Sequence, residues 1–280
     1  MSDMHLVELG TGVFSWIDPV ARFGNSNVGL VIDADGLTVI DTTATPARGA
    51  AAANAIAGLT AQLELPIRRV VLTSSRVAFS GGGSAFWQAA FYGSDDTSDQ
   101  LDQPANPDAF RRLLPHLADA YDAEFTTRPV THTVSEPAWL SGAAQGLPLP
   151  GESPTNLAVH VPGADVVFAG ALASFGVTPL AYDGDPLRWI ESLQEIRDLA
   201  ATVVPGHGSP GGRADVDDLI GYLVACVEAA GDPGRIPAGP WDTWADRRFD
   251  RVNVERAARL AGGDNTVPTA MFELLGVGPA

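Results

Sequence analysis

Strand-like segments followed by helical segments occur twice along the chain, and this repetition restricts the fold more than any other feature. The first set of short β-branched or aromatic runs lies at 12–16, 28–32, 37–40, 70–72 and 91–93, with a helical pattern at 46–62. The second set lies at 129–134, 138–149, 157–161, 165–169 and 202–204, with helical patterns at 186–199 and 216–230. Each helix must bury its apolar face. We therefore expect an α/β protein with helices outside a core of two sheets.

No break in composition and no low-complexity linker divides the chain. A single domain over residues 1–280 is therefore expected, with a C-terminal helical segment at about 240–280 packed on it. Further helical patterns cover 107–123 and 252–261. The loops expected at 94–107 and 171–186 are long enough to form pocket walls.

The negative net charge of the chain makes some classes of binding partner unfavourable. Asp and Glu number 34 against 17 Lys and Arg, which gives a formal net charge of −17. Such a surface repels phosphate backbones and anionic lipid, so neither nucleic acid nor a membrane is an expected partner. All 17 basic residues are Arg, which excludes a Walker A lysine, a Schiff-base lysine and a pyridoxal-phosphate enzyme. The single cysteine, Cys226, excludes an intramolecular disulfide and a thiolate-rich metal site.

The N-terminal segment carries no targeting signal that we recognise. It lacks a basic region followed by an apolar stretch, so no signal peptide is expected. No apolar run approaches the ~20 residues that span a bilayer. A cytoplasmic location is the resulting expectation.

Four short motifs follow one another in a recognisable order. They are Thr73–Gly82 (TSSRVAFSGG), Gly151–Thr155 (GESPT), Phe168–Ala171 (FAGA) and Val204–Gly208 (VPGHG). Together they resemble the landmarks of the metallo-β-lactamase superfamily, and Ile40-Asp41-Thr42 is similar to its aspartate-bearing strand end before the first helix. The resemblance covers most of the chain. It implies a four-layer αββα sandwich with the pocket at one edge.

The resemblance also implies where two zinc ions would bind, and most of those ligands are replaced here. The seven ligand positions hold Ser74, Arg76, Ala78, Phe79, Glu152, Ala171 and His207. Of these, His207 alone keeps the family ligand. Ala and Phe offer no lone pair, and Arg has donors but no acceptor. Zinc needs three to four converging N, O or S ligands, so we expect no zinc and no other cofactor.

Charge balance predicts what takes the place of the metal ions. A carboxylate left buried without a cation costs several kcal/mol. Arg76 and Glu152 replace ligands of the same metal ion, so they should lie within reach of each other. An Arg76–Glu152 ion pair is therefore predicted.

The polar residues at these positions allow more than one role. His207 could act as a general base, with Glu152 orienting it and Ser74 or Ser75 as nucleophile; alternatively, Pro-Gly-His-Gly is a structural turn. Arg76 could clamp an anionic group of a substrate or serve only in the ion pair. No Gly-x-Ser-x-Gly elbow occurs in the sequence, which counts against a hydrolase-type nucleophile.

Other residues are candidates for contact with a ligand. The expected catalytic residues are His207, Glu152, Arg76 and Ser74, and the expected substrate-binding residues are Ser75, Ser80, Phe79 and Ser174. The Ser80–Ser84 run resembles an anion-binding nest, although a Gly-rich turn is also part of the family frame. Trp241 and Trp244 could form a lid over an apolar ligand, pack the C-terminal segment or contact a second copy in a homodimer.

These observations leave three functions open. The favoured one is a metal-independent hydrolase-like, lyase-like or cyclase-like enzyme acting on a small organic molecule. The alternatives are a pseudoenzyme that binds a small ligand or a protein partner, and a hydrolase with one metal ion held by His207 and Glu152.

Overall fold

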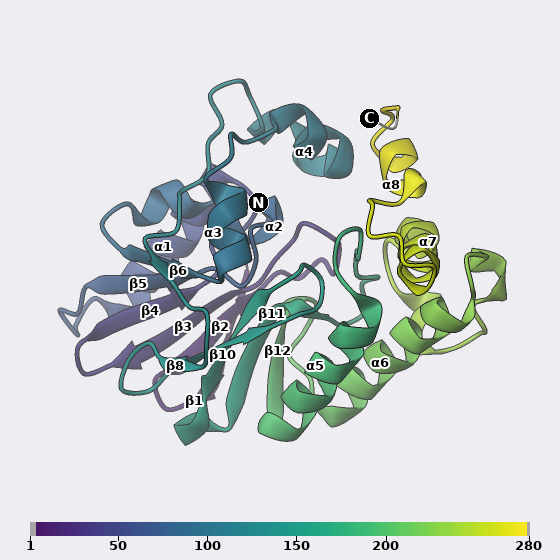
Figure 1. Cartoon of the computed structure of the whole chain (residues 1–280). Helices are drawn as coiled ribbons and strands as arrows, with labels where there is room; N and C mark the ends of the chain where they lie inside the picture. The colour runs from purple at the N-terminus through teal and green to yellow at the C-terminus, as the bar shows by residue number, and fades with distance from the viewer. Residues whose placement is uncertain (1–3, 279–280) are drawn as a thin grey trace.

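Two mixed β-sheets pack face to face and carry helices on their outer faces, as Figure 1 shows. The structure is a computed structural model that describes residues 4–278. Side chains from both sheets meet in one buried cluster, which includes Val31 and Ile40 from the first sheet and Val159 and Phe168 from the second. The expected αββα sandwich is therefore confirmed.

The first sheet is antiparallel at one side and parallel at the other. Its strands, in spatial order, are β1 (His5–Gly10), β2 (Val13–Ile17), β3 (Val28–Asp33), β4 (Gly36–Ile40), β5 (Ile67–Val71), β6 (Ala90–Gly93) and β7 (His132–Thr133). The first four pair antiparallel, and β4 to β7 pair parallel. The hairpin from β3 to β4 turns at Ala34-Asp35, within the Asp33–Gly36 run, whose residues favour a hairpin turn.

The second sheet is mainly antiparallel. Its strands, in spatial order, are β12 (Thr202–His207), β11 (Val166–Ser174), β10 (Asn156–Val161), β9 (Gln145–Leu149) and β8 (Ala138–Trp139). Only β11 and β12 pair parallel. Because β11 and β12 run together, the segments that follow their carboxyl ends lie at the same edge of the sandwich.

Helices cover the outer face of each sheet. Helix α1 (Pro46–Thr60) packs Ala52 and Ile56 against the first sheet, and its N-cap Thr45 accepts a hydrogen bond from the Arg48 N–H. Helices α5 (Pro186–Leu199) and α6 (Arg213–Glu228) bury apolar side chains against the second sheet. No helix within residues 4–278 has the length and apolar character needed to cross a membrane.

The remaining helices lie around one edge of the sandwich (Figure 1). They are α2 (Val77–Ser80), α3 (Asp95–Leu101), α4 (Pro107–Leu113), α7 (Asp250–Ala261) and α8 (Thr269–Leu274). A buried cluster joins Phe249 and Met271 of the C-terminal segment to Phe23 and Tyr121. Trp241 and Trp244 pack on Tyr222 of α6, with ring centroids 6.1 and 5.5 Å away, so they form packing and not a lid.

Several expected elements differ from the structure. The expected loop at 94–107 contains α3, whose N-cap Ser94 accepts a hydrogen bond from the Thr97 N–H. The expected strand at 138–149 is split into β8 and β9 by a turn in which the N–H groups of Leu140 and Ser141 bond to the Ala144 carbonyl. The expected helix at 107–123 ends at Leu113 and is followed by a 3₁₀ helix at Pro115–Ala120. Strand β1 and helix α8 are additional to the expectation.

Candidate functional site

The centre of the candidate site is the predicted ion pair between Arg76 and Glu152, which the structure confirms. Arg76 precedes α2, and Glu152 lies in the turn between β9 and β10. The Arg76 Nε donates a 2.8 Å hydrogen bond to Glu152 Oε1. Both side chains are largely buried, with 13% and 7% of their side-chain surfaces exposed. The pair therefore satisfies two charges that would otherwise be costly to bury.

The rest of the Arg76 guanidinium contacts the segment between β11 and α5. One terminal nitrogen donates to the Tyr182 hydroxyl, and the other forms a second ion pair with Asp183. The guanidinium carbon also lies 4.0 Å from the centroid of the Tyr182 ring, in a cation–π contact. Arg76 is thus held by two carboxylates and one phenol.

Glu152 depends on its neighbours to stay ionised. Burial raises the pKa of the Glu152 carboxyl, Arg76 acts in the opposite direction, and the nearby Asp183 raises it further. Its Oε2 atom accepts hydrogen bonds from Ser74 Oγ at 3.2 Å and from Asn156 Nδ2 at 3.3 Å. Ser74 itself is fully buried, with 0% exposed surface. Its hydroxyl therefore donates to the Glu152 carboxylate inside the protein and does not face solvent.

His207 lies apart from this network. It ends β12, and its Nε2 accepts a 3.1 Å hydrogen bond from the Gly24 N–H. Phe23 stacks on the imidazole at 5.3 Å and Phe79 meets it edge-on at 5.3 Å. Burial lowers the pKa of His207 to about 4, so the ring is neutral with its proton on Nδ1.

The expected Ser–His–acid arrangement is therefore not formed. Within residues 4–278, His207 hydrogen-bonds to a backbone N–H and not to Ser74, Ser75 or Glu152. The physical reason is that two phenylalanine rings enclose the imidazole, and the nitrogen that would act as base is already an acceptor. The alternative reading of Val-Pro-Gly-His-Gly as a structural turn agrees with these contacts.

The residues at the implied metal positions do not fit a zinc site. Ala78, Phe79 and Ala171 form a buried apolar cluster where the resemblance would place three ligands. Glu152 is occupied by Arg76, and the Nε2 lone pair of His207 is taken by Gly24, so a single ion shared by these two residues is not favoured either. In the part of the chain that the structure describes, no group of three or more His, Cys, Asp and Glu side chains is placed to hold a metal ion.

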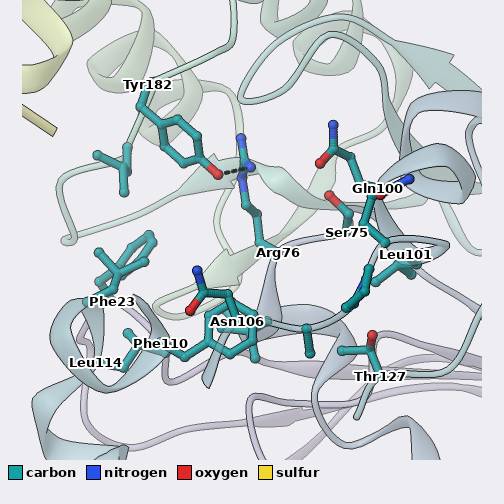
Figure 2. A pocket seen from close by; sticks show the side chains of 17 residues that line it. Phe23, Ser75, Arg76, Gln100, Leu101, Asn106, Phe110, Leu114, Thr127 and Tyr182 are labelled. Carbon is teal, nitrogen blue, oxygen red and sulfur yellow. Dashed lines mark hydrogen bonds between the residues drawn. The ribbon is translucent and has the colours of Figure 1, made fainter. Parts of the chain in front are cut away.

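A cavity of about 200 Å³ opens beside Arg76 (Figure 2). Its walls include Gln100–Leu101 and Gln103–Asn106 from one expected wall loop, and Leu180 and Tyr182 from the other, so the prediction that 94–107 and 171–186 form pocket walls is confirmed. Phe23, Phe110 and Leu114 close one side of the cavity, and Ser75 and Gln100 lie on the other side of Arg76 (Figure 2).

Of the expected substrate-binding residues, Ser75 lines this cavity and three others do not. Phe79 is buried in the apolar cluster beside His207. The Ser80 hydroxyl donates to the carbonyl oxygens of Ser75 and Arg76, as helical geometry allows. The Ser174 hydroxyl donates to the Val177 carbonyl at 2.6 Å. These three side chains are used by local contacts and lie outside the cavity lining.

The Gly-rich run after Ser80 serves close packing. A Cβ atom at Gly82 would collide with the Thr42 carbonyl oxygen and would lie 2.8 Å from the Gly49 Cα atom, at the first turns of α1. Gly82 also donates its N–H to the Thr43 carbonyl. The backbone here is therefore packed against its neighbours, which leaves no open nest for an anion.

Tyr182, Asp183 and the apolar wall of Phe23, Phe110 and Leu114 are the site residues that sequence reasoning missed. The length of the 171–186 loop was the only signal that pointed to Tyr182 and Asp183. The aromatic wall carried no signal, because Phe23 lies in a segment without a recognised motif.

Solved structures share this architecture. The sec-alkylsulfatase Pisa1 from Pseudomonas sp., described as stereoselective and inverting, is similar with a TM-score of 0.69 and 16% identity over 92% of this chain. The mono-zinc form of the metallo-β-lactamase FIM-1 from Pseudomonas aeruginosa has a TM-score of 0.60 and 18% identity over 85% of this chain. A metallo-β-lactamase from Hirschia baltica has a TM-score of 0.59 and 21% identity over 79%.

These similarities identify the architecture as the metallo-β-lactamase fold. The chain spans 50% of the alkylsulfatase, but 99% and 97% of the two lactamases. No protein-family model matches the sequence. The structural similarity shows the fold, and a fold does not by itself specify the chemistry of a site.

Proposed function

We propose that this protein binds a small organic molecule in the cavity beside Arg76, without a bound metal ion. The observation that carries the proposal is the Arg76–Glu152 ion pair, which occupies two of the implied metal-ligand positions while Ala78, Phe79 and Ala171 occupy three others. A guanidinium supplies a fixed positive charge where a zinc ion would otherwise balance the carboxylate. It cannot also activate a water molecule as zinc does.

The shape and lining of the cavity support small-molecule binding. The lining offers apolar surface and a few polar groups, and the apolar part comes from Phe23, Phe110, Leu113, Leu114 and Leu180. This combination of a mostly apolar lining with convergent polar groups is typical of ligand sites. At about 200 Å³ the cavity is smaller than the ~300 Å³ at the lower end of common ligand pockets, which favours a compact ligand.

Metal-independent catalysis on the bound molecule is the second candidate. Ser75, Arg76 and Tyr182 line the same cavity, so a hydroxyl, a guanidinium and a phenol face one bound molecule. This set could carry a hydrolase-like, lyase-like or cyclase-like step through electrostatic stabilisation. Of the residues expected to be catalytic, Arg76 lines the cavity, whereas His207, Glu152 and Ser74 do not and would not contact the bound molecule.

The first test is whether metal matters. Protein purified without chelator is analysed for zinc, iron and manganese and then titrated with zinc by calorimetry. We expect substoichiometric metal and no zinc binding tight enough to survive dialysis. A stoichiometric metal ion that is lost when His207 is replaced by Ala would overturn the proposal.

The second test fills the cavity. A library of small organic fragments is screened by ligand-observed NMR against the wild type and the Ala105→Trp variant, because Ala105 lines the cavity. The matched control is Ala123→Trp, at an exposed position outside the lining. We expect hits that bind the wild type and the control but not the filled variant. Hits that bind all three proteins equally would contradict the assignment of this cavity.

The third test separates binding from catalysis. The wild type and Ser75→Ala are assayed against chromogenic esters, a chromogenic cephalosporin and an aryl sulfate, in the presence of a chelator. Turnover that survives the chelator and falls with Ser75→Ala supports the second candidate. Binding in the NMR screen without any turnover supports the first.

A further inference from the structure

We infer that the cavity beside Arg76 selects an uncharged ligand and rejects anions, although an arginine lines it. This inference rests on the proposed function and specifies its ligand class: a compact molecule with an apolar body and one hydrogen-bonding oxygen, such as a hydroxyl or carbonyl group. The observation behind it is that the Arg76 guanidinium already has hydrogen-bond and ion-pair partners within the protein.

Arg76 is the one charged side chain among the 17 residues that line the cavity within the described chain. Its charge is balanced on the side away from the cavity. Glu152 and Asp183 each form an ion pair with it, and neither carboxylate lines the cavity. One positive charge therefore faces two negative charges before any ligand arrives.

A third carboxylate adds to this balance. Burial raises the pKa of Asp96, repulsion by Asp183 raises it further, and the positive charge of Arg76 lowers it. Arg256 also lies close to Asp183, but it directs its donors to the carbonyl oxygens of Asp183, Gly184, Asn265 and Thr266 and does not line the cavity. The surroundings of Arg76 thus carry no surplus positive charge.

An anion entering this cavity would lose its hydration and gain little in return. Removing an ion from water is costly unless an unpaired opposite charge receives it. Arg76 has five N–H donors, of which Glu152, Tyr182 and Asp183 engage one each, so two remain for a neutral oxygen acceptor. A cation is also disfavoured, because the group that faces it is the guanidinium itself.

The polar residues around Arg76 suit an uncharged group. Ser75, Gln100, Asn106, Thr127 and Tyr182 line the cavity and offer hydroxyl and amide groups that donate or accept hydrogen bonds (Figure 2). Phe23, Phe110 and Leu114 supply apolar surface to the same cavity. The arrangement accommodates an alkyl or aryl body with a single polar end.

A set of three probes with the same apolar body tests the inference. Octanol, octanoate and octylammonium are titrated into the full-length protein at pH 7.5 and followed by NMR and calorimetry. We expect octanol to bind most tightly, with both ions weaker by at least about tenfold. Octanoate or octylammonium binding as tightly as octanol would overturn the inference and leave the proposed function standing. No binding of octanol, together with no hits in the fragment screen, would overturn the proposed function itself.

Charge variants test the cause. Asp183→Asn keeps an oxygen that accepts from Arg76 but removes one balancing charge, so the ratio of octanoate to octanol affinity should rise about tenfold. Asp217→Asn is the control, since it removes the same charge from an exposed pair with Arg197 and should leave the ratio unchanged. Glu152→Gln serves as a second variant if Asp183→Asn unfolds. An unchanged ratio in a folded variant would show that charge balance does not set the selectivity.

Discussion

Arg76 Nε and Glu152 Oε1 lie 2.8 Å apart although 76 residues separate them in the sequence. Glu152 comes from the turn between β9 and β10, in the second sheet, and Arg76 follows β5, in the first. The pair therefore joins the two halves of the sandwich at the edge where the cavity opens. Its partners Ser74, Asn156 and Asp183 extend the same connection.

Removing the positive charge of this pair should destabilise the protein strongly. In Arg76→Met, Glu152 stays buried without its main compensating charge, and we expect the free energy of unfolding to fall by about 3 kcal/mol. Chemical denaturation at pH 7 measures this free energy of unfolding. Adding Glu152→Gln to Arg76→Met should recover much of the lost stability, because no unpaired carboxylate then stays buried.

The control for this experiment is Arg111→Met. Arg111 pairs with Asp108 at the surface, with 40% and 80% of their side chains exposed, so its loss should cost less than about 1 kcal/mol. If Arg76→Met costs no more than Arg111→Met, the buried pair does not have the structural role assigned to it.

The sequence predicted elements whose signals are local. Pro46, which opens the helical pattern at 46–62, suits the first turn of a helix, and the structure begins α1 at Pro46 with Thr45 as its N-cap. Helix α3 was missed although Ser94 is a good N-cap and Asp95 and Asp96 follow it in the first turn. The helix is seven residues long, so its apolar positions are too few to show a helical period.

The site was predictable only where motifs fixed the positions of its residues. Arg76 and Glu152 were paired correctly because both stand at positions that the resemblance assigns to one metal ion. Tyr182 and Asp183 lie more than 100 residues beyond Arg76 and belong to no motif. The enclosure of His207 depends on Phe23, which reaches it from a distant loop. Such contacts are set by tertiary packing, which the pattern of one sequence does not contain.

The buried His207 should make folding sensitive to acid. Burial holds its folded pKa at about 4, below the value of 6.5 in the unfolded chain. The unfolded state therefore takes up the proton first, so this stabilising contribution is present above pH 6.5 and is lost as the pH falls toward 4. In His207→Gln, the loss of unfolding free energy between pH 7 and pH 4 should be smaller by on the order of 3 kcal/mol.

Denaturation curves of wild type and variant at a series of pH values check this expectation. His132→Gln, at an exposed position, is the matched control and should follow the wild type. Parallel pH profiles for His207→Gln and the wild type would argue against a neutral, buried imidazole.

Asp41 should act in the opposite direction. It directly follows β4 with a φ of 62°, and its carboxylate accepts hydrogen bonds from the Thr73 N–H and hydroxyl at 2.8–3.0 Å. Burial raises its pKa from 3.8 to about 7, against the lowering effect of Thr73. The folded state thus favours the protonated acid, and the contribution of Asp41 to stability falls as the pH rises from about 4 to about 7.

Asp41→Asn removes this titration and keeps a residue that tolerates positive φ. Its stability relative to the wild type should rise by a few kcal/mol between pH 4 and pH 7 and then level off. Thermal and chemical denaturation measure the difference, with Asp102→Asn, at an exposed position, as control. A difference that stays constant with pH would show that Asp41 is ionised in the fold throughout this range.

The packing of Phe79 over Gly206 explains why the last motif keeps a glycine before His207. A Cβ atom at Gly206 would lie 2.5 Å from the Phe79 ring and 2.8 Å from the Gly170 carbonyl oxygen. Gly206→Ala should therefore lower the free energy of unfolding by about 1–3 kcal/mol through overpacking. Combining it with Phe79→Leu should relieve part of the clash, so the double variant is more stable than the sum of the two single changes predicts.

A double-mutant cycle by chemical denaturation measures this coupling. Gly163→Ala is the control, because a Cβ atom there would meet nothing within 4 Å and should change stability by less than about 0.5 kcal/mol. Strict additivity of Gly206→Ala and Phe79→Leu would mean that the two residues do not constrain each other. A positive coupling means that the Phe79 ring is part of the packing that holds His207 in place.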